Sequence, residues 1–322
     1  MHIIEGFLTD SGGIAMKTNR YLKWSLLFFA LWFLNLLLIH RLQITAVTGD
    51  LNLYSAESEE FREQAVSVKA YGKLLEFSGR YQIDQADAMT VFMVMNRFKL
   101  TDHTKMTEGE FRRGYRILMK YKPEEYALLR EAYSAVWKGI SWFPVAADSN
   151  GTTVTEFEDS WMSERSYQGE RRHEGCDVFC AEQGQEGETP RGYYPVVSAT
   201  DGFVEKIGWL PLGGYRIGIR SMNGGYFYYA HLYTYERDFQ VGDAVKAGEV
   251  LGLMGDSGYG DEGTTGQFPV HLHFGIYFNT EDGREISVNP YSVLRVLEGN
   301  RKVHAPTGRG NSLHCSTTYV IL

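Results

Sequence analysis

The sequence has few cysteines and no dense run of basic residues. Only three cysteines occur in 322 residues: Cys176, Cys180 and Cys315. An odd and low count is not the pattern of a disulfide framework. Cys176 and Cys180 would lie about 13 Å apart in an extended chain, too far for a bridge, so we predict unpaired thiols. The net charge is −8, and this acidic balance argues against nucleic acid as the main partner.

A long uncharged apolar run lies near the N-terminus. Residues 24–39 read WSLLFFALWFLNLLLI, and with their flanks they approach the ~20 residues needed to cross a bilayer. Three basic residues precede the run, whereas Arg41 alone follows it closely, before an acidic stretch. The positive-inside rule therefore predicts a single-pass anchor in the cell membrane at residues 21–42. Residues 1–20 are then a short cytoplasmic N-terminus, and the bulk of the chain lies outside the cytoplasm.

Two other interpretations of this run remain open, a cleaved signal peptide and a buried core helix. The run is longer than the usual apolar part of a signal peptide, and no convincing cleavage site follows it. We therefore favour the uncleaved anchor. Met16, directly before the basic cluster, is a second candidate start, in which case residues 1–15 carry no meaning.

Residues 55–140 show apolar positions three and four apart, which predicts four helices in a small bundle. The first helix is expected over residues 56–77. Start signals mark the other three: Asp84 as a cap, Thr107 with Glu110 as a capping box, and Pro123 in a first turn. No pattern here is tied to chemistry. The region is a spacer, a substrate-positioning module or a surface for an envelope protein partner, and the sequence does not decide among these.

From about residue 141, short β-type runs separated by glycine turns replace the helical pattern. Asn223-Gly224-Gly225 joins two such runs and predicts a hairpin. Many short strands with frequent turns indicate a mainly antiparallel β domain, which we place at residues 141–297. The polar tail at 298–322 is expected to be disordered. The predicted fold class is therefore α+β overall.

Two of the four histidines in this domain stand together in His271-Leu272-His273. On a strand, residues two apart share a face, so both imidazoles project together while Leu272 and Phe274 face the other side. Such a pair can form half of a zinc site, or a ligand beside a catalyst. Two surface histidines are the alternative.

His173 and Asp177 stand four apart in the segment HEGCD. Gly175 argues against a helix, so we expect a loop that enters a strand. The pair can supply two ligands of a three-ligand catalytic zinc site, or the aspartate can simply hydrogen-bond a turn. The segment lacks the second histidine and the helix of HExxH, and Glu174 as a general base is a minor alternative. His231 in YFYYAHLY, taken alone, fits a packed or surface histidine.

Taken together, HEGCD, YAHL and HLH resemble, in this order, the HxxxD, histidine-strand and HxH motifs of the lysostaphin-type, or LytM-like, zinc metallopeptidases. The intervening VGDAVKAGEVLGLMGDSG resembles the glycine-rich stretch of that family. The resemblance covers residues 190–292 and the HEGCD segment. It implies one zinc ion per chain and a zinc metalloendopeptidase activity that uses metal-activated water.

The resemblance also implies roles for individual residues and a substrate class. The implied zinc ligands are His173, Asp177 and His273, and the implied catalytic pair is His231 with His271. The implied substrates are peptide cross-links or stem peptides of bacterial peptidoglycan, and an anchor that faces outward agrees with a wall substrate. Two alternatives stay open: a non-enzymatic envelope binding or assembly protein with the same fold, and a zinc peptidase that cuts proteins. The glycine-rich segment 259–269 is interpreted as a rim or lid over the substrate groove.

Overall fold

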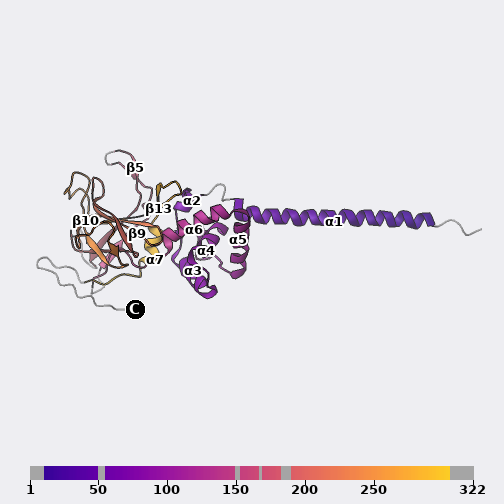
Figure 1. The fold of residues 1–322 in the computed structure, drawn as a ribbon, viewed down its shortest axis with the longest axis horizontal. Helices are drawn as coiled ribbons and strands as arrows, with labels where there is room; N and C mark the ends of the chain where they lie inside the picture. The colour runs from indigo at the N-terminus through magenta and orange to yellow at the C-terminus, as the bar shows by residue number, and fades with distance from the viewer. Residues whose placement is uncertain (1–10, 50–54, 149–152, 167–168, 183–189, 305–322) are drawn as a thin grey trace, which may run out of the picture.

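The computed structural model describes residues 11–49, 55–148, 153–166, 169–182 and 190–304. Along the chain, Figure 1 shows a long projecting helix, then a group of short helices, then a β domain at the other end. This order confirms the predicted α+β fold, with an N-terminal apolar helix, a small helical region and a mainly antiparallel β region. Residues 1–10 of the predicted cytoplasmic segment, the predicted tail from residue 305 onward, and Cys315 lie outside the described residues.

Helix α1 (Ser11–Thr48) is 38 residues long and projects away from the rest of the protein (Figure 1). Its part from Arg20 to Thr48 is long and apolar enough to cross a membrane, and none of its most apolar stretch is buried. Only the last turn is covered, where Val47 and Thr48 are buried and the helix meets α4 and α5. A signal sequence near the N-terminus passes the same test of length and composition as a membrane anchor.

Five further helices follow: α2 (Glu59–Arg62), α3 (Val68–Tyr81), α4 (Gln85–Met95), α5 (Glu108–Tyr121) and α6 (Pro123–Trp137). The three predicted start signals are confirmed. The Asp84 carboxylate accepts a hydrogen bond from the Ala86 amide at 2.9 Å, and Thr107 and Glu110 form a complete capping box. Pro123 stands in the first turn of α6.

The single helix predicted over residues 56–77 is wrong, because the chain breaks after α2. Gln64 adopts a left-handed φ of 49°, and β1 (Ala65–Val66) then pairs in parallel with β2 (Lys99–Leu100). Gln64 is fully buried, and its side-chain oxygen accepts a hydrogen bond from Trp137 Nε1 at 2.6 Å. This tertiary partner, which the local apolar spacing does not reveal, stabilises the break.

The described residues of the β region form twelve strands: β3 (Thr153–Glu156), β4 (Glu164–Arg165), β5 (Arg171–Arg172), β6 (Cys176–Glu182), β7 (Pro195–Val197), β8 (Gly202–Leu210), β9 (Gly214–Ser221), β10 (Tyr226–Tyr235), β11 (Ala244–Val245), β12 (Val250–Met254), β13 (Leu272–Asn279) and β14 (Glu285–Val288). Ten of them form one antiparallel sheet, with the order β11-β8-β9-β10-β13-β6-β3 along its main path. The predicted hairpin through Asn223-Gly224-Gly225 is confirmed as β9–β10. Helix α7 (Tyr291–Leu297) was not predicted, since its seven residues are too few to show a clear helical period.

Strand β6 shows how the sheet separates its two faces. Cys176, Val178 and Cys180 are buried on one face, while Asp177 and Phe179 are less buried on the other. The prediction of unpaired thiols is confirmed for Cys176 and Cys180, and burial raises the pKa of each to about 12. Neither thiol is therefore a nucleophile near neutral pH.

The helical region and the β sheet share one hydrophobic core. The ring of Phe61 from α2 lies 5.7 Å from that of Phe278 in β13 and 4.7 Å from that of Tyr133 in α6. Arg62 Nε donates a hydrogen bond to the Ser287 carbonyl of β14 at 2.8 Å. The β region is therefore packed against the helices rather than tethered to them.

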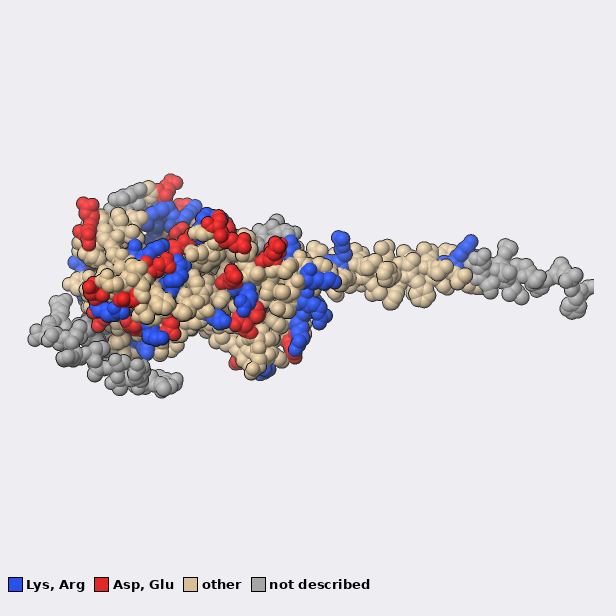
Figure 2. Space-filling model, viewed as in Figure 1, with Lys and Arg blue, Asp and Glu red and all other residues tan. Residues whose placement is uncertain are grey.

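Basic side chains gather beside the base of α1, over α5 (Figure 2). Four basic residues of α5 are exposed: Arg112, Arg113, Arg116 and Lys120. They form a cationic surface next to the point where α1 leaves the body of the protein.

Candidate metal centre and groove

Three side chains from two neighbouring strands and the loop before them converge at one point. Asp177 in β6 pairs directly with His273 in β13, and His173 stands in the turn between β5 and β6. His173 Nε2 lies 2.9 Å from His273 Nδ1 and 3.1 Å from Asp177 Oδ1, and His273 Nδ1 also lies 3.1 Å from that oxygen. Zinc bonds of about 2.0–2.2 Å in tetrahedral geometry place ligand atoms a little over 3 Å apart, so this donor set fits a zinc ion.

The contacts of His173 point its Nε2 atom toward the other two candidate ligands. Its Nδ1 lies 3.0 Å from the Ser160 carbonyl, an acceptor, and 3.1 Å from Arg165 Nη2, a donor that also binds Asp177. In the tautomer that satisfies the carbonyl, Nδ1 carries the proton and Nε2, the atom that faces Asp177 and His273, keeps its lone pair. On the other side of the cluster, Arg165 Nη2 donates to Asp177 Oδ2 at 2.8 Å and leaves Oδ1 facing the histidines. Such contacts behind the ligands orient them for a metal. No sequence motif marks Arg165, which lies in a charged run without a recognisable pattern.

Gly175 is required by the close approach of the HEGCD turn to His273. A Cβ atom at this position would stand 2.6 Å from His273 Cε1 and Nε2, and 2.8 Å from the Phe274 carbonyl. Any larger residue would push the imidazole away from Asp177. The glycine that the sequence offered as evidence against a helix thus also makes room for the third candidate ligand.

His271 and His231 flank this cluster and share one hydrogen-bond arrangement. His271 Nδ1 donates to the Pro269 carbonyl at 2.7 Å, and His231 Nδ1 donates to the Ser257 carbonyl at 2.8 Å. Each ring therefore keeps an unprotonated Nε2, and that of His271 lies 3.6 Å from Asp177 Oδ1. The two ring centroids are 4.8 Å apart. The structure thus brings all five predicted residues into one site.

A β-bulge turns His231 toward the site. Its φ is +62°, and the pairing of β10 with β9 shifts between Tyr229 and Leu232. Without the bulge, alternation would place His231 on the same face as Tyr229, which is fully buried in the core. The bulge instead brings it to the face of Tyr228, which lines the groove. Tyr233, further along the same strand, is exposed and is not among the residues that line the groove.

Burial and mutual contacts set the charges in the cluster. Burial alone would raise the pKa of Asp177, but the close contacts with His173 and His273 bring it well below its usual range. Burial lowers the pKa of His231, His271 and His273. At neutral pH, Asp177 is therefore a carboxylate and these three imidazoles are neutral, which are the forms that bind zinc or accept a proton.

Comparisons with known proteins agree with this geometry. Residues 171–289, which contain all five site residues, match the model of peptidase family M23. A candidate glycyl-glycine endopeptidase LytM from Ruminococcus gnavus, of known crystal structure, is 41% identical; the alignment covers 78% of this chain and 94% of that chain, with a TM-score of 0.64. The chain belongs to peptidase family M23.

The chain is also similar to a curated endopeptidase. The L-Ala–D-Glu endopeptidase of Bacillus subtilis is 39% identical over 175 residues, which are 54% of this chain. The chain spans about half the length of this relative, 49%. The M23 match begins at β5, so the helices and α1 lie outside it.

The M23 site opens into a groove of about 930 Å³ on the exposed face of the sheet. One wall comes from the segment predicted as a rim or lid, where the ring of Phe268 packs 4.5 Å from that of His231 and 4.8 Å from that of Tyr259. A second wall is the β4–β5 hairpin, which contacts the first where Arg171 donates to the Tyr259 hydroxyl at 2.8 Å. The floor carries Tyr226 and Tyr228 of β10. An extended peptide can lie along such a groove past the histidines.

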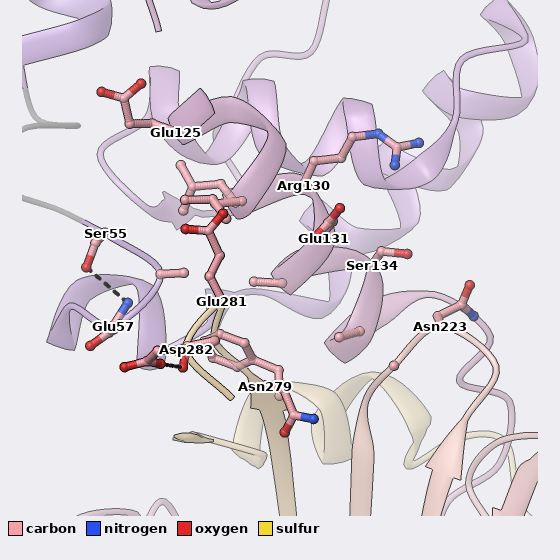
Figure 3. Close-up of a pocket in the computed structure, with 18 of the residues that line it drawn as sticks. Ser55, Glu57, Glu125, Arg130, Glu131, Ser134, Asn223, Asn279, Glu281 and Asp282 are labelled. Atoms are coloured by element: carbon pink, nitrogen blue, oxygen red, sulfur yellow. Dashed lines mark hydrogen bonds between the residues drawn. The ribbon is translucent and has the colours of Figure 1, made fainter. Parts of the chain in front are cut away.

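A second cavity, of about 610 Å³, lies between α6 and the turn from β13 to β14 (Figure 3). The figure shows carboxylates on both sides, including Glu125 and Glu131 from α6 and Glu281 and Asp282 from the turn. Among the described residues that line it there is no histidine or cysteine. It therefore lacks the combination of histidines and aspartate that is found in the groove.

Proposed function

We propose that this M23 protein is a zinc-dependent endopeptidase that hydrolyses peptide cross-links or stem peptides of bacterial peptidoglycan. The observation that carries the proposal is the convergence of three donor atoms, from His173, Asp177 and His273, beside two further histidines whose Nε2 atoms are unprotonated. The three donors would bind one zinc ion and leave a coordination position open, as in catalytic zinc sites.

A bound zinc ion supplies Lewis-acid chemistry there, since it polarises a carbonyl and lowers the pKa of a water molecule toward neutrality. The remaining roles belong to side chains of the protein. Nε2 of His231 or His271 can accept the proton of the attacking water, because in each ring the Nδ1–H is already held by a backbone carbonyl. Once protonated, the same atom can donate to the oxygen charge that develops on the scissile carbonyl or to the leaving amine.

The substrate class follows from the two relatives. One is named for the L-Ala–D-Glu bond and the other is described as a candidate for a glycyl-glycine bond, so one relative points to a stem peptide and the other to a glycine bridge. Both match this chain at about the same identity, 39% and 41%. The open groove with aromatic walls suits either extended peptide.

Zinc-loaded full-length protein in detergent is expected to solubilise peptidoglycan and release peptides with new N-termini. Chelation should abolish the release, because the three donor side chains cannot replace the metal, and added zinc should restore it. Mass spectrometry of the released muropeptides identifies the bond. Full activity after chelation would contradict zinc dependence, and absence of new termini on every wall preparation would contradict the endopeptidase. Because the helices share a core with the sheet, the full chain is the right sample.

The proposal also places α1 in the cell membrane, with its N-terminus in the cytoplasm and the M23 region outside. The apolar span of α1 and the excess of basic residues before it support this. The cationic surface of α5 supports contact of this end of α1 with lipid headgroups and does not bear on the orientation. That surface lies beside the last turn of α1, at the level where lipid headgroups would meet the protein. Protease added to intact spheroplasts is expected to digest the M23 region but to spare an N-terminal tag. Release of the protein into the medium would instead indicate a cleaved signal.

A further inference from the structure

The groove contains five basic side chains, and one of them differs from the rest. Four have a partner at 2.8–3.2 Å: Arg165 with Asp177, Arg171 with Tyr259, Arg172 with Glu164, and Lys206 with Glu285. Arg216 has no ion pair, and its Nε and Nη1 atoms are buried with no hydrogen-bond partner, within the part of the chain that the structure describes.

An arginine whose buried N–H groups have no acceptor can bind a ligand that supplies one. Buried N–H donors without an acceptor destabilise a protein, and natural structures rarely keep them without a function. The planar guanidinium group presents adjacent N–H donors that match the two oxygens of a carboxylate. The Nε atoms of Arg165 and Arg171 are also buried without a partner, but each of these two side chains has another hydrogen bond through Nη2.

The sheet places Arg216 close to the candidate metal centre. Ile217 and Ile219 of β9 are buried in the core, so Arg216 projects to the opposite face, over the groove. Its neighbours in β9 pair with Tyr229 and Leu232, the two residues that bracket the bulge at His231. Strand β10 separates β9 from β13, so the backbone of Arg216 lies about two strand spacings, or roughly 10 Å, from that of His273. An extended peptide covers that distance in about three residues, and the long arginine side chain shortens it.

We propose that Arg216 is a specificity-determining residue that binds a carboxylate of the peptide substrate, within one or two residues of the scissile bond. This inference rests on the proposed endopeptidase function and selects between its two substrate types. A glutamyl residue has two carboxyl groups, of which only one joins the next peptide bond, so a stem peptide cut between L-Ala and D-Glu offers a free carboxylate. A glycine bridge offers none and would leave the Arg216 donors unpartnered.

The test uses two synthetic peptides that contain the L-Ala–D-Glu bond and differ in one group. One has the free glutamyl carboxylate, and the other has a primary amide in its place. Binding to the zinc-free full-length protein is measured by calorimetry, so that this result does not depend on hydrolysis. The carboxylate peptide is expected to bind about 10- to 100-fold more tightly, the range for a hydrogen bond to a charged group. R216Q should remove this preference, and R216K should keep only part of it.

R237Q serves as the matched control, because Arg237 lies outside the groove and already pairs with Asp243 at 2.6 Å. It should keep the full preference for the carboxylate. Equal binding of the two peptides by the wild type, binding of neither, or an unchanged preference in R216Q would overturn the proposal. Cleavage of both peptides by the zinc-loaded protein at equal rates would support the endopeptidase function and contradict the Arg216 subsite. A clear binding preference without cleavage would support the Arg216 subsite and contradict the endopeptidase function.

Discussion

Replacing Asp177 with alanine is expected to abolish zinc binding and to reduce peptidoglycan hydrolysis by more than about 100-fold. Changes behind the ligands of a metal site typically cost 10–100-fold in metal affinity or activity, and loss of a ligand itself should cost more. Asp177 Oδ1 stands 3.1 Å from both His173 Nε2 and His273 Nδ1 and is the only anionic donor of the three. Without it, two neutral imidazoles would face a divalent cation with no charge to balance it.

The measurement is zinc content by mass spectrometry together with the rate of wall solubilisation. D243A is a suitable control, because Asp243 is an aspartate of the same β region that pairs with Arg237 and lies outside the groove. It should bind one zinc ion per chain and hydrolyse the wall at the wild-type rate. If D177A held a full equivalent of zinc and retained its activity, the proposed ligand set would be wrong.

Part of this site follows from the sequence by geometry alone. Residues two apart on a strand point to the same face. His271 and His273 do lie on one side of the sheet, with Leu272 and Phe274 buried on the other. The helix caps also follow from local chemistry. By contrast, Asp177 and His273 are 96 residues apart in the sequence, and the residue spacing within either strand does not predict that the two strands pair. Only the resemblance to a known family brought these residues together in advance.

Other features depend on contacts that no local pattern encodes. Strict alternation along β10 would turn His231 into the core. The bulge that redirects it requires a left-handed φ at His231 itself, and no glycine at that position signals this from the sequence. The break between α2 and α3 depends on a hydrogen bond from Trp137, 73 residues away. Arg165 and Arg216 belong to no motif, and they matter because one is held by the carboxylate of Asp177 while the other has no partner among the described residues. In each case tertiary contacts decide what the residue can do.

Replacing His271 with alanine is expected to lower kcat by about 10²–10⁴-fold, the usual contribution of a positioned acid–base group, while zinc content stays at one ion per chain. The reason is geometric. His271 Nδ1 donates to the Pro269 carbonyl, and its Nε2 stands 3.6 Å from Asp177 Oδ1, beside the three donors rather than among them. The substitution therefore removes a proton acceptor and leaves His173, Asp177 and His273 in place.

The same substitution at His231 should have a similar effect, and the double variant should fall little further than either single variant. Groups that act on one proton transfer are strongly non-additive, because the loss of one already disables the step. H103A provides the control, since His103 is an exposed histidine in the helical region. Loss of zinc from H271A in step with activity would make His271 a ligand, and an unchanged kcat would remove it from the mechanism. The contrast with D177A is what separates the two roles: one variant loses the metal, and the other keeps the metal but loses the base beside it.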